Sequence, residues 1–173
     1  MRTATLLVAA TGSLFLCCPV ADAGPPQTPA VVATDLAAIA AECTGVGGKA
    51  LTNYAIKRVD LNGDGKEDYV LDVGSIQCEG AASAYGDRGK DLAVYVGDGA
   101  GGARKAFSAW VYASTLEGTG PAARLWLTVS GEQCGKKPAA SFASESFCER
   151  YIQWNAKAGK FDFAPVSTVK MVQ

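Results

Sequence analysis

The stretch DLNGDGKEDYV, residues Asp60–Val70, is an acidic loop that runs directly into apolar residues. Counting from Asp60, side chains with oxygen atoms occupy positions 1, 3, 5 and 9 of the loop, which are Asp60, Asn62, Asp64 and Asp68. The backbone carbonyl of Lys66 lies at position 7. Hard oxygen donors around one centre suit a divalent cation of the calcium type. The alternative is a solvated turn, which Asp-Gly and Asn-Gly pairs form readily. We predict that this loop binds calcium.

The loop is not an EF-hand, because it lacks the acidic ligand that closes such a loop. An EF-hand places a glutamate at position 12 and a helix on each side. Position 12 here is Leu71, and the apolar run DYVLDV already begins at position 9. We therefore expect the loop to connect two strands, with Gly63 and Gly65 permitting the tight backbone path.

Alternating apolar and polar residues continue on both sides of the loop, which predicts a sheet. The expected strands are YAIKRV (54–59), DYVLDVG (68–74), DLAVYVG (91–97), AFSAWVYA (106–113), RLWLTVSG (124–131), CERYIQW (148–154) and KFDFA (160–164). Glycine-rich turns are expected at 97–102 and 155–160. Strands joined by short turns without intervening helices favour antiparallel pairing.

One helix is expected before the strands. Leu36, Ile39, Ala40 and Cys43 follow a helical period, Thr34 or Asp35 could cap the start, and glycines follow from position 45. The proline-rich residues 24–33 read as an extended linker. The fold class is thus mainly β (α+β): an antiparallel sheet, curled or sandwiched, with one N-terminal helix packed on it, forming a single calcium-loop domain over residues 34–173.

Residues 1–23 resemble a secretory signal peptide. Arg2 precedes an apolar stretch, and Ala21-Asp22-Ala23 forms a small-x-small cleavage site. Two alternatives are a lipoprotein signal that ends at Cys17 or Cys18 and a buried N-terminal helix. The apolar stretch is too short to span a bilayer, so no membrane span is expected. The prediction is a periplasmic or secreted protein.

The formal net charge is −1, which excludes the strongly basic surface that nucleic acid requires. Four of the six cysteines lie beyond the signal, and in an oxidising compartment an even number favours disulfides. Three pairings are possible. We favour Cys43 with Cys78, which bracket the acidic loop, and Cys134 with Cys148, which close a short polar loop. A zinc site is disfavoured because the chain has no histidine.

The acidic loop, D-x-N-x-D-G-x-x-D followed by apolar residues, resembles the calcium loops of FG-GAP and VCBS-type repeats. The segment DLAVYVGDGAGGARKAF, Asp91–Phe107, is similar to the later strand and glycine-rich turn of such a repeat. Those families build propellers from many copies, whereas this chain holds one copy. A closer resemblance is to small secreted bacterial proteins of unknown function with one such loop, a helix and paired cysteines; it implies a periplasmic location and no activity.

The sequence also argues against catalysis. Without histidine, neither a Ser-His nor a Cys-His pair can form, so we predict that the protein is not an enzyme. Five aromatic residues suggest core or cross-strand packing in preference to a binding face: Trp110, Tyr112, Trp126, Tyr151 and Trp154. Two functions are expected. The first is a calcium-binding structural or binding module for an unknown protein or cell-envelope ligand, and the alternative is a secreted inhibitor of a lysozyme or protease.

Overall fold

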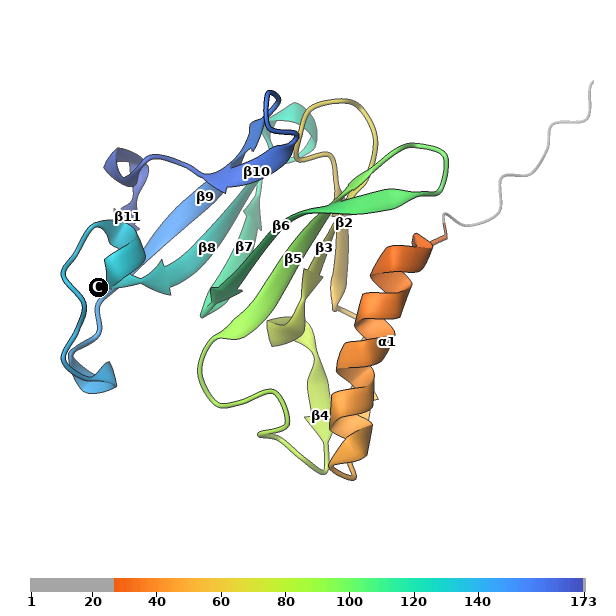
Figure 1. Ribbon diagram of the computed structural model, residues 1–173, viewed down its shortest axis with the longest axis horizontal. Helices are drawn as coiled ribbons and strands as arrows, with labels where there is room; N and C mark the ends of the chain where they lie inside the picture. Colours follow the sequence, from red (N-terminus) through yellow and green to blue (C-terminus); the bar gives the residue numbers. More distant parts are fainter. Residues whose placement is uncertain (1–26, 173) are drawn as a thin grey trace, which may run out of the picture.

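Strand β3, Asp68–Asp72, is the buried centre of the first sheet, and all five of its residues are buried. In the computed structural model, which describes residues 27–172, it pairs antiparallel with β2 (Ile56–Val59) and with β5 (Lys90–Gly97). Strand β6 (Ala103–Val111) pairs with β5 and completes the order β2-β3-β5-β6 (Figure 1). The acidic loop therefore connects two antiparallel neighbours, as predicted.

The second sheet has the strand order β10-β9-β8-β7. Its strands are β7 (Ala113–Glu117), β8 (Arg124–Ser130), β9 (Phe147–Asn155) and β10 (Lys160–Phe163), and β11 (Lys170–Met171) also pairs with β9. Only Tyr112 separates β6 from β7, so the chain passes from one sheet to the other within one residue. The backbone N–H of Tyr112 donates to the carbonyl of Thr128 at 2.8 Å, which joins this corner to β8.

The larger core lies between the two sheets. Leu125, Leu127 and Val129 alternate with half-buried residues along β8, and their side chains are fully buried. They belong to one apolar cluster with Val70 of β3 and Val94 of β5. Burying one face of each sheet in this way removes apolar area from water and stabilises the fold.

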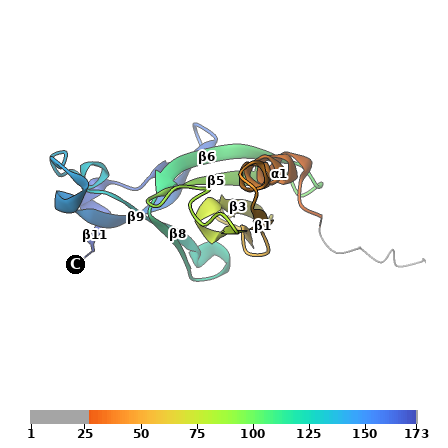
Figure 2. The same cartoon turned by 90° about the horizontal axis from the view of Figure 1, so that it is seen from below.

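The helix α1, Ala30–Gly45, covers part of the other face of the first sheet. Val32, Leu36 and Ile39 contact a second apolar cluster that contains Tyr69 and Tyr95. In Figures 1 and 2 the first sheet lies between α1 and the strands β8 and β9. The helix begins four residues before the predicted start, so residues 30–33, assigned above to the linker, are helical, and neither Thr34 nor Asp35 caps the helix.

Short elements complete the fold. Strands β1 (Lys49–Leu51) and β4 (Gln77–Glu79) form a separate two-stranded sheet beside the end of α1. Short 3₁₀ turns cover Val73–Ser75, Gly120–Ala122, Gly131–Cys134, Phe142–Ser144 and Val166–Thr168. The mainly β fold with antiparallel sheets and one packed helix is the fold class that the sequence predicts.

Two disulfides join the favoured cysteine pairs. Cys43, in the last turn of α1, bonds to Cys78 of β4, with their Cα atoms 5.7 Å apart. Cys134 bonds to Cys148 at the start of β9, with their Cα atoms 6.1 Å apart. The first bridge attaches α1 to the two-stranded sheet, and both bridges are typical of proteins that fold in an oxidising environment.

The five aromatic residues pair across strands or border the core, as with Trp154, which packs against the larger apolar cluster. None of the five named rings is buried, and Trp110 keeps 46% of its surface exposed. Pairing across strands does occur: Trp126 of β8 lies opposite Tyr151 of β9, with ring centroids 5.0 Å apart. Half-exposed rings on a sheet surface are stabilised by such neighbours without being enclosed.

The predicted signal peptide, residues 1–23, lies outside the described residues. Within residues 27–172, no helix combines the length and apolar character that a membrane span requires.

Candidate metal centre

The acidic loop occupies residues 60–67 between β2 and β3. The two flanking strands pair up to the position where Val59 faces Asp68, so the loop closes directly on the end of a hairpin. Gly63 and Gly65 have φ angles of 77° and 79°, in the left-handed region that favours glycine. These two residues bend the backbone around the carboxylate of Asp60.

The carboxylate of Asp60 is surrounded by backbone N–H groups of its own loop. Its Oδ1 accepts a hydrogen bond from Gly63 N at 2.7 Å, and its Oδ2 accepts one from Gly65 N at 2.9 Å. Each carboxylate oxygen has two lone pairs, so each retains an acceptor position for a cation.

Asn62 and Asp64 hold the outer part of the loop through Asx turns. Asn62 Oδ1 accepts from the N–H of Asp64 at 2.9 Å, and Asp64 Oδ1 accepts from the N–H of Lys66 at 2.9 Å. Glu67, at position 8, instead forms an ion pair with Arg58 at 3.8 Å. The side chains of Asn62 and Asp64 are thus held within the loop, whereas that of Glu67 points to Arg58 of β2.

Asp68 directly follows the loop as the first residue of β3, and its side chain is fully buried. Its Oδ2 accepts from Leu61 N at 3.0 Å and Asn62 N at 3.2 Å, and its Oδ1 accepts from Gly97 N at 3.2 Å. Burial raises the pKa of this carboxyl to about 6, because the desolvation cost outweighs the three hydrogen bonds that favour the charged form. A buried carboxylate of this kind gains from a nearby positive charge.

The glycine-rich hairpin between β5 and β6 packs against the acidic loop. A Cβ atom on Gly97 would lie 2.1 Å from the carbonyl oxygen of Glu67, so only glycine permits this approach. The side chain of Lys66 lies over Gly99, whose φ is 75°. The two segments on which the resemblance to a calcium-loop repeat rests are therefore neighbours in space.

The described residues contain no group of three or more Asp, Glu or Cys side chains placed to hold a metal. The carboxylates of Asp60, Asp64 and Asp68 therefore do not converge into a ready-made cluster. The donor set nevertheless has the chemistry of a calcium site, since it combines carboxylate, amide and carbonyl oxygens. The side-chain oxygens of Asp60, Asn62 and Asp64 keep lone pairs. Asp68 keeps one at Oδ1, because its Oδ2 already accepts two hydrogen bonds. The residues present fit a hard divalent cation.

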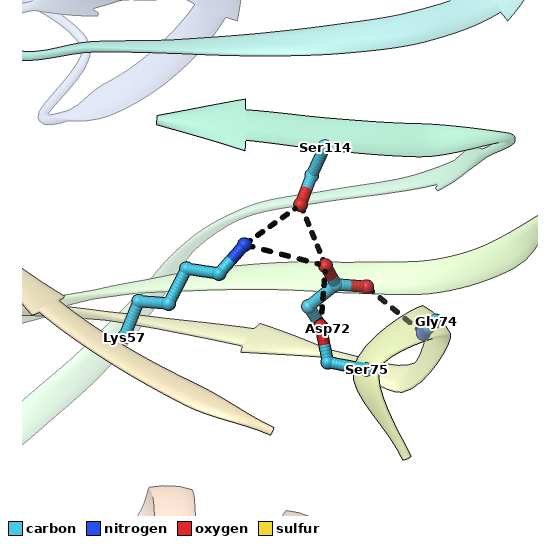
Figure 3. A network of polar contacts seen from close by, with 5 residues as sticks. All are labelled: Lys57, Asp72, Gly74, Ser75 and Ser114. Atoms are coloured by element: carbon cyan, nitrogen blue, oxygen red, sulfur yellow. Dashed lines mark hydrogen bonds and ion pairs between the residues drawn. The ribbon is translucent and has the colours of Figure 1, made fainter. Parts of the chain in front are cut away.

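A second buried acid, Asp72, lies at the other end of β3, and sequence reasoning did not single it out. Its Oδ2 accepts from Ser114 Oγ at 2.6 Å and from Ser75 Oγ at 3.2 Å, and its Oδ1 accepts from Gly74 N at 2.9 Å (Figure 3). Lys57 Nζ lies 3.8 Å from Asp72 Oδ2 and donates to Ser114 Oγ at 3.2 Å. The network links β2 and β3 of one sheet to β7 of the other.

The burial of Asp72 could have been predicted from its position in the sequence. Asp68, Val70 and Asp72 lie at every second position, so they share one face of β3. An aspartate that shares a face with a core valine in an apolar run predicts a buried, hydrogen-bonded carboxylate.

Comparisons with protein families, curated proteins and solved structures found no match to the chain. The resemblance of the loop to FG-GAP and VCBS-type repeats therefore rests on residues 59–107 themselves.

Proposed function

We propose that the protein is a calcium-binding, disulfide-stabilised binding or structural module that acts in the periplasm or outside the cell. The observation that carries this proposal is Asp68, a fully buried carboxylate at the end of a loop rich in oxygen donors. Its burial is costly unless a positive charge compensates it. The two disulfides support an oxidising compartment.

The ligands in this proposal are the side-chain oxygens of Asp60, Asn62, Asp64 and Asp68 and the carbonyl of Lys66. Calcium held by these oxygens would supply the positive charge that compensates the buried carboxylate of Asp68. The protein residues contribute the geometry: backbone N–H groups orient Asp60, and the buried hydrogen bonds orient Asp68. The partner of the module is a protein or a cell-envelope component, without nucleic-acid or membrane-spanning contacts.

Thermal unfolding in calcium, magnesium and chelator tests this proposal. Extracellular calcium modules bind with dissociation constants of about 0.1–1 mM, and calcium at 10 to 100 times that value adds roughly 1.4–2.7 kcal/mol of stability. The same concentration of magnesium should raise the melting temperature less, because magnesium demands a tighter octahedron. Identical melting curves in calcium and in chelator, together with no heat of binding by calorimetry, would reject the calcium site.

A second candidate function is inhibition of a hydrolase by the loop between Cys134 and Cys148. The loop carries Phe142, which is 45% exposed and lies beside Tyr112, with ring centroids 6.3 Å apart. The guanidinium of Arg88 lies 4.3 Å from the centre of the Phe142 ring. An exposed ring on a disulfide-tethered loop can enter a cleft with little loss of conformational entropy.

Equimolar inhibition assays separate the two functions. The intact protein is mixed with lysozymes and proteases, and the Phe142→Ala variant is compared with the neighbouring Ser141→Ala variant. The inhibitor function predicts that only the first variant loses inhibition. Absence of inhibition across the tested enzymes, combined with retention of the protein on cell-envelope material, would favour the binding module.

A further inference from the structure

Helix α1 leaves a strip of the first sheet uncovered. The helix packs over β3, part of β5 and the start of β6, whereas later residues on the same face of β6 remain exposed, among them Lys105, Ser108 and Trp110. The uncovered strip forms a groove of about 380 Å³ between α1 and β6. Because it lies on the face of β3 that is opposite to Asp68 and includes no residue of the acidic loop, this groove is separate from the proposed calcium site.

One end of the groove is closed by a satisfied polar cluster. Asp35 of α1 pairs with Lys105 Nζ at 2.7 Å and accepts a hydrogen bond from the hydroxyl of Tyr95. The pKa of Asp35 is lowered, mainly by the Lys105 hydrogen bond and then by that of Tyr95. At this end the negative charge is already balanced.

The middle of the groove is apolar. Ala38 and Ile39 of α1 form one wall, and Ala93 and the buried side chain of Leu71 lie along its base. A cavity with an apolar middle and a few polar groups at its ends is the usual form of a small-molecule site.

The opposite end carries an unbalanced negative charge, that of Asp91. This exposed residue lines the groove, and among the described residues no cationic side chain pairs with it. The two nearest cations along the chain are engaged elsewhere: Lys90 Nζ donates to the carbonyl of Gly86, and Arg88 lies over Phe142.

An exposed indole lies across the strand pair from this carboxylate, at the rim of the groove. The strand register places Trp110 of β6 opposite Asp91 of β5. Trp110 is 46% exposed, and its ring packs over Gly89, two residues before Asp91. A carboxylate attracts a cation by charge, and an indole face attracts it through the ring quadrupole. Both groups therefore select the same class of ligand.

We propose that this groove binds a small organic cation, a protonated amine with an apolar body. The ammonium group lies between Asp91 and Trp110, and the apolar body extends along the groove toward Ile39. An anionic ligand is disfavoured because it would face Asp91 without a compensating cation. The proposal would give the module a ligand, and it does not rest on calcium binding.

Calorimetric titration with three probes of similar size and different charge tests the proposal. The probes are phenethylamine, 2-phenylethanol and 3-phenylpropionate, added to the full protein at neutral pH with calcium present. The amine should bind most tightly, the alcohol about tenfold more weakly, and the carboxylate least, since only the amine gains the charge-assisted contact. Backbone and indole N–H shifts in NMR spectra should map the amine to Asp91, Ser108 and Trp110.

Matched variants decide whether the groove is responsible. Asp91→Asn should weaken binding of the amine about tenfold, and Trp110→Phe should weaken it by a smaller factor. Asp87→Asn, an exposed acid outside the groove, should leave the affinity unchanged. Ser108→Trp should block all probes by filling the groove. Urea unfolding of each variant confirms that it is folded.

The contrary results are equally specific. Binding of the carboxylate as tight as that of the amine, unchanged affinity in Asp91→Asn, shifts that map outside the groove, or no binding by the amine would each overturn the proposal. None of these results depends on the calcium titration, so the two proposals fail separately.

Discussion

The buried carboxylate of Asp68 accepts a hydrogen bond from the backbone N–H of Gly97 at 3.2 Å, although the residues are 29 positions apart. This contact joins the end of the acidic loop to the start of the glycine-rich hairpin. A ligand that orders the loop therefore also acts on the hairpin, and a change in the hairpin alters the loop.

Gly97→Ala should destabilise the protein and weaken calcium binding together. The added Cβ would lie 2.1 Å from the Glu67 carbonyl oxygen, so the hairpin must move away from the loop. Overpacking of this kind costs about 1–3 kcal/mol. Urea unfolding in chelator measures the stability loss, and calorimetry measures calcium affinity.

Gly45→Ala is the matched control for that substitution. Gly45 ends α1, and a Cβ there meets no atom within 4 Å. The variant should be as stable as the wild type or slightly more stable, because alanine has less conformational freedom than glycine in the unfolded chain. Equal stability of the Gly97 and Gly45 variants would contradict the close approach described above.

Asp60→Ala should lower stability even in chelator. The sequence alone suggests that removing one of several crowded carboxylates relieves repulsion, but in the structure Asp60 accepts hydrogen bonds from Gly63 and Gly65. Losing these contacts costs about 1 kcal/mol, and the calcium-dependent rise in melting temperature should disappear as well.

Glu67→Ala is the control at the neighbouring acid. Glu67 forms an exposed ion pair with Arg58, and such pairs contribute about 0–1 kcal/mol. Its calcium response should match that of the wild type. A calcium response that survives in Asp60→Ala but vanishes in Glu67→Ala would require a different ligand set.

Ser114→Ala should weaken the contact between the two sheets. The substitution removes the 2.6 Å hydrogen bond from Ser114 Oγ to the Asp72 carboxylate, and hydrogen bonds to charged groups contribute about 1.5–3 kcal/mol. The urea midpoint should fall accordingly. Thr115→Ala changes the exposed face of the same strand and should shift stability by less than about 0.5 kcal/mol. Equal shifts would indicate that the Asp72 network contributes nothing.

Asp35→Asn should remove part of the pH dependence of stability. The pKa of Asp35 is lower in the folded state than in the unfolded state. Its carboxylate therefore adds to the free energy of unfolding at pH values above the unfolded pKa of about 3.9, and this stabilisation is lost as the pH falls through the lower folded pKa. The side chain is 33% exposed, so this contribution is about 1 kcal/mol or less.

Urea midpoints at pH 6 and pH 3 measure that effect. The wild type should lose more stability between the two values than the Asp35→Asn variant, whose amide oxygen still accepts the Tyr95 hydrogen bond. Asp87→Asn, at an exposed position, should behave like the wild type. A variant with the same pH dependence as the wild type would refute the role of Asp35.

The longer strands could be predicted from the sequence because each carries its own alternation. The segment DLAVYVG forms β5, and RLWLTVSG forms β8, whose Leu125, Leu127 and Val129 face the core. Strands β1, β4 and β11 have only two or three residues, which is too short for a period. Their pairing depends on partners that are distant in sequence.

The start of the helix and the details of the site also depend on contacts between residues that are distant in the sequence. The early helix start depends on Val32, whose burial against the sheet is a tertiary contact that no local pattern reports. The loop donors were visible from spacing, whereas the burial of Asp68 and its bond to Gly97 depend on the neighbouring hairpin. The sequence also carried no sign that Asp91 and Trp110 would face each other, because strand register is set by the whole sheet.

The two disulfides enclose separate stretches of chain, 43–78 and 134–148, and neither stretch overlaps the other. When a polypeptide enters an oxidising compartment with its N-terminus first, Cys43 and Cys78 are both present before Cys134 arrives. The first bridge can therefore form, and attach α1 to the segment that contains the acidic loop, before the residues of the second sheet have entered. Biosynthesis in this order needs no reshuffling of cysteine partners.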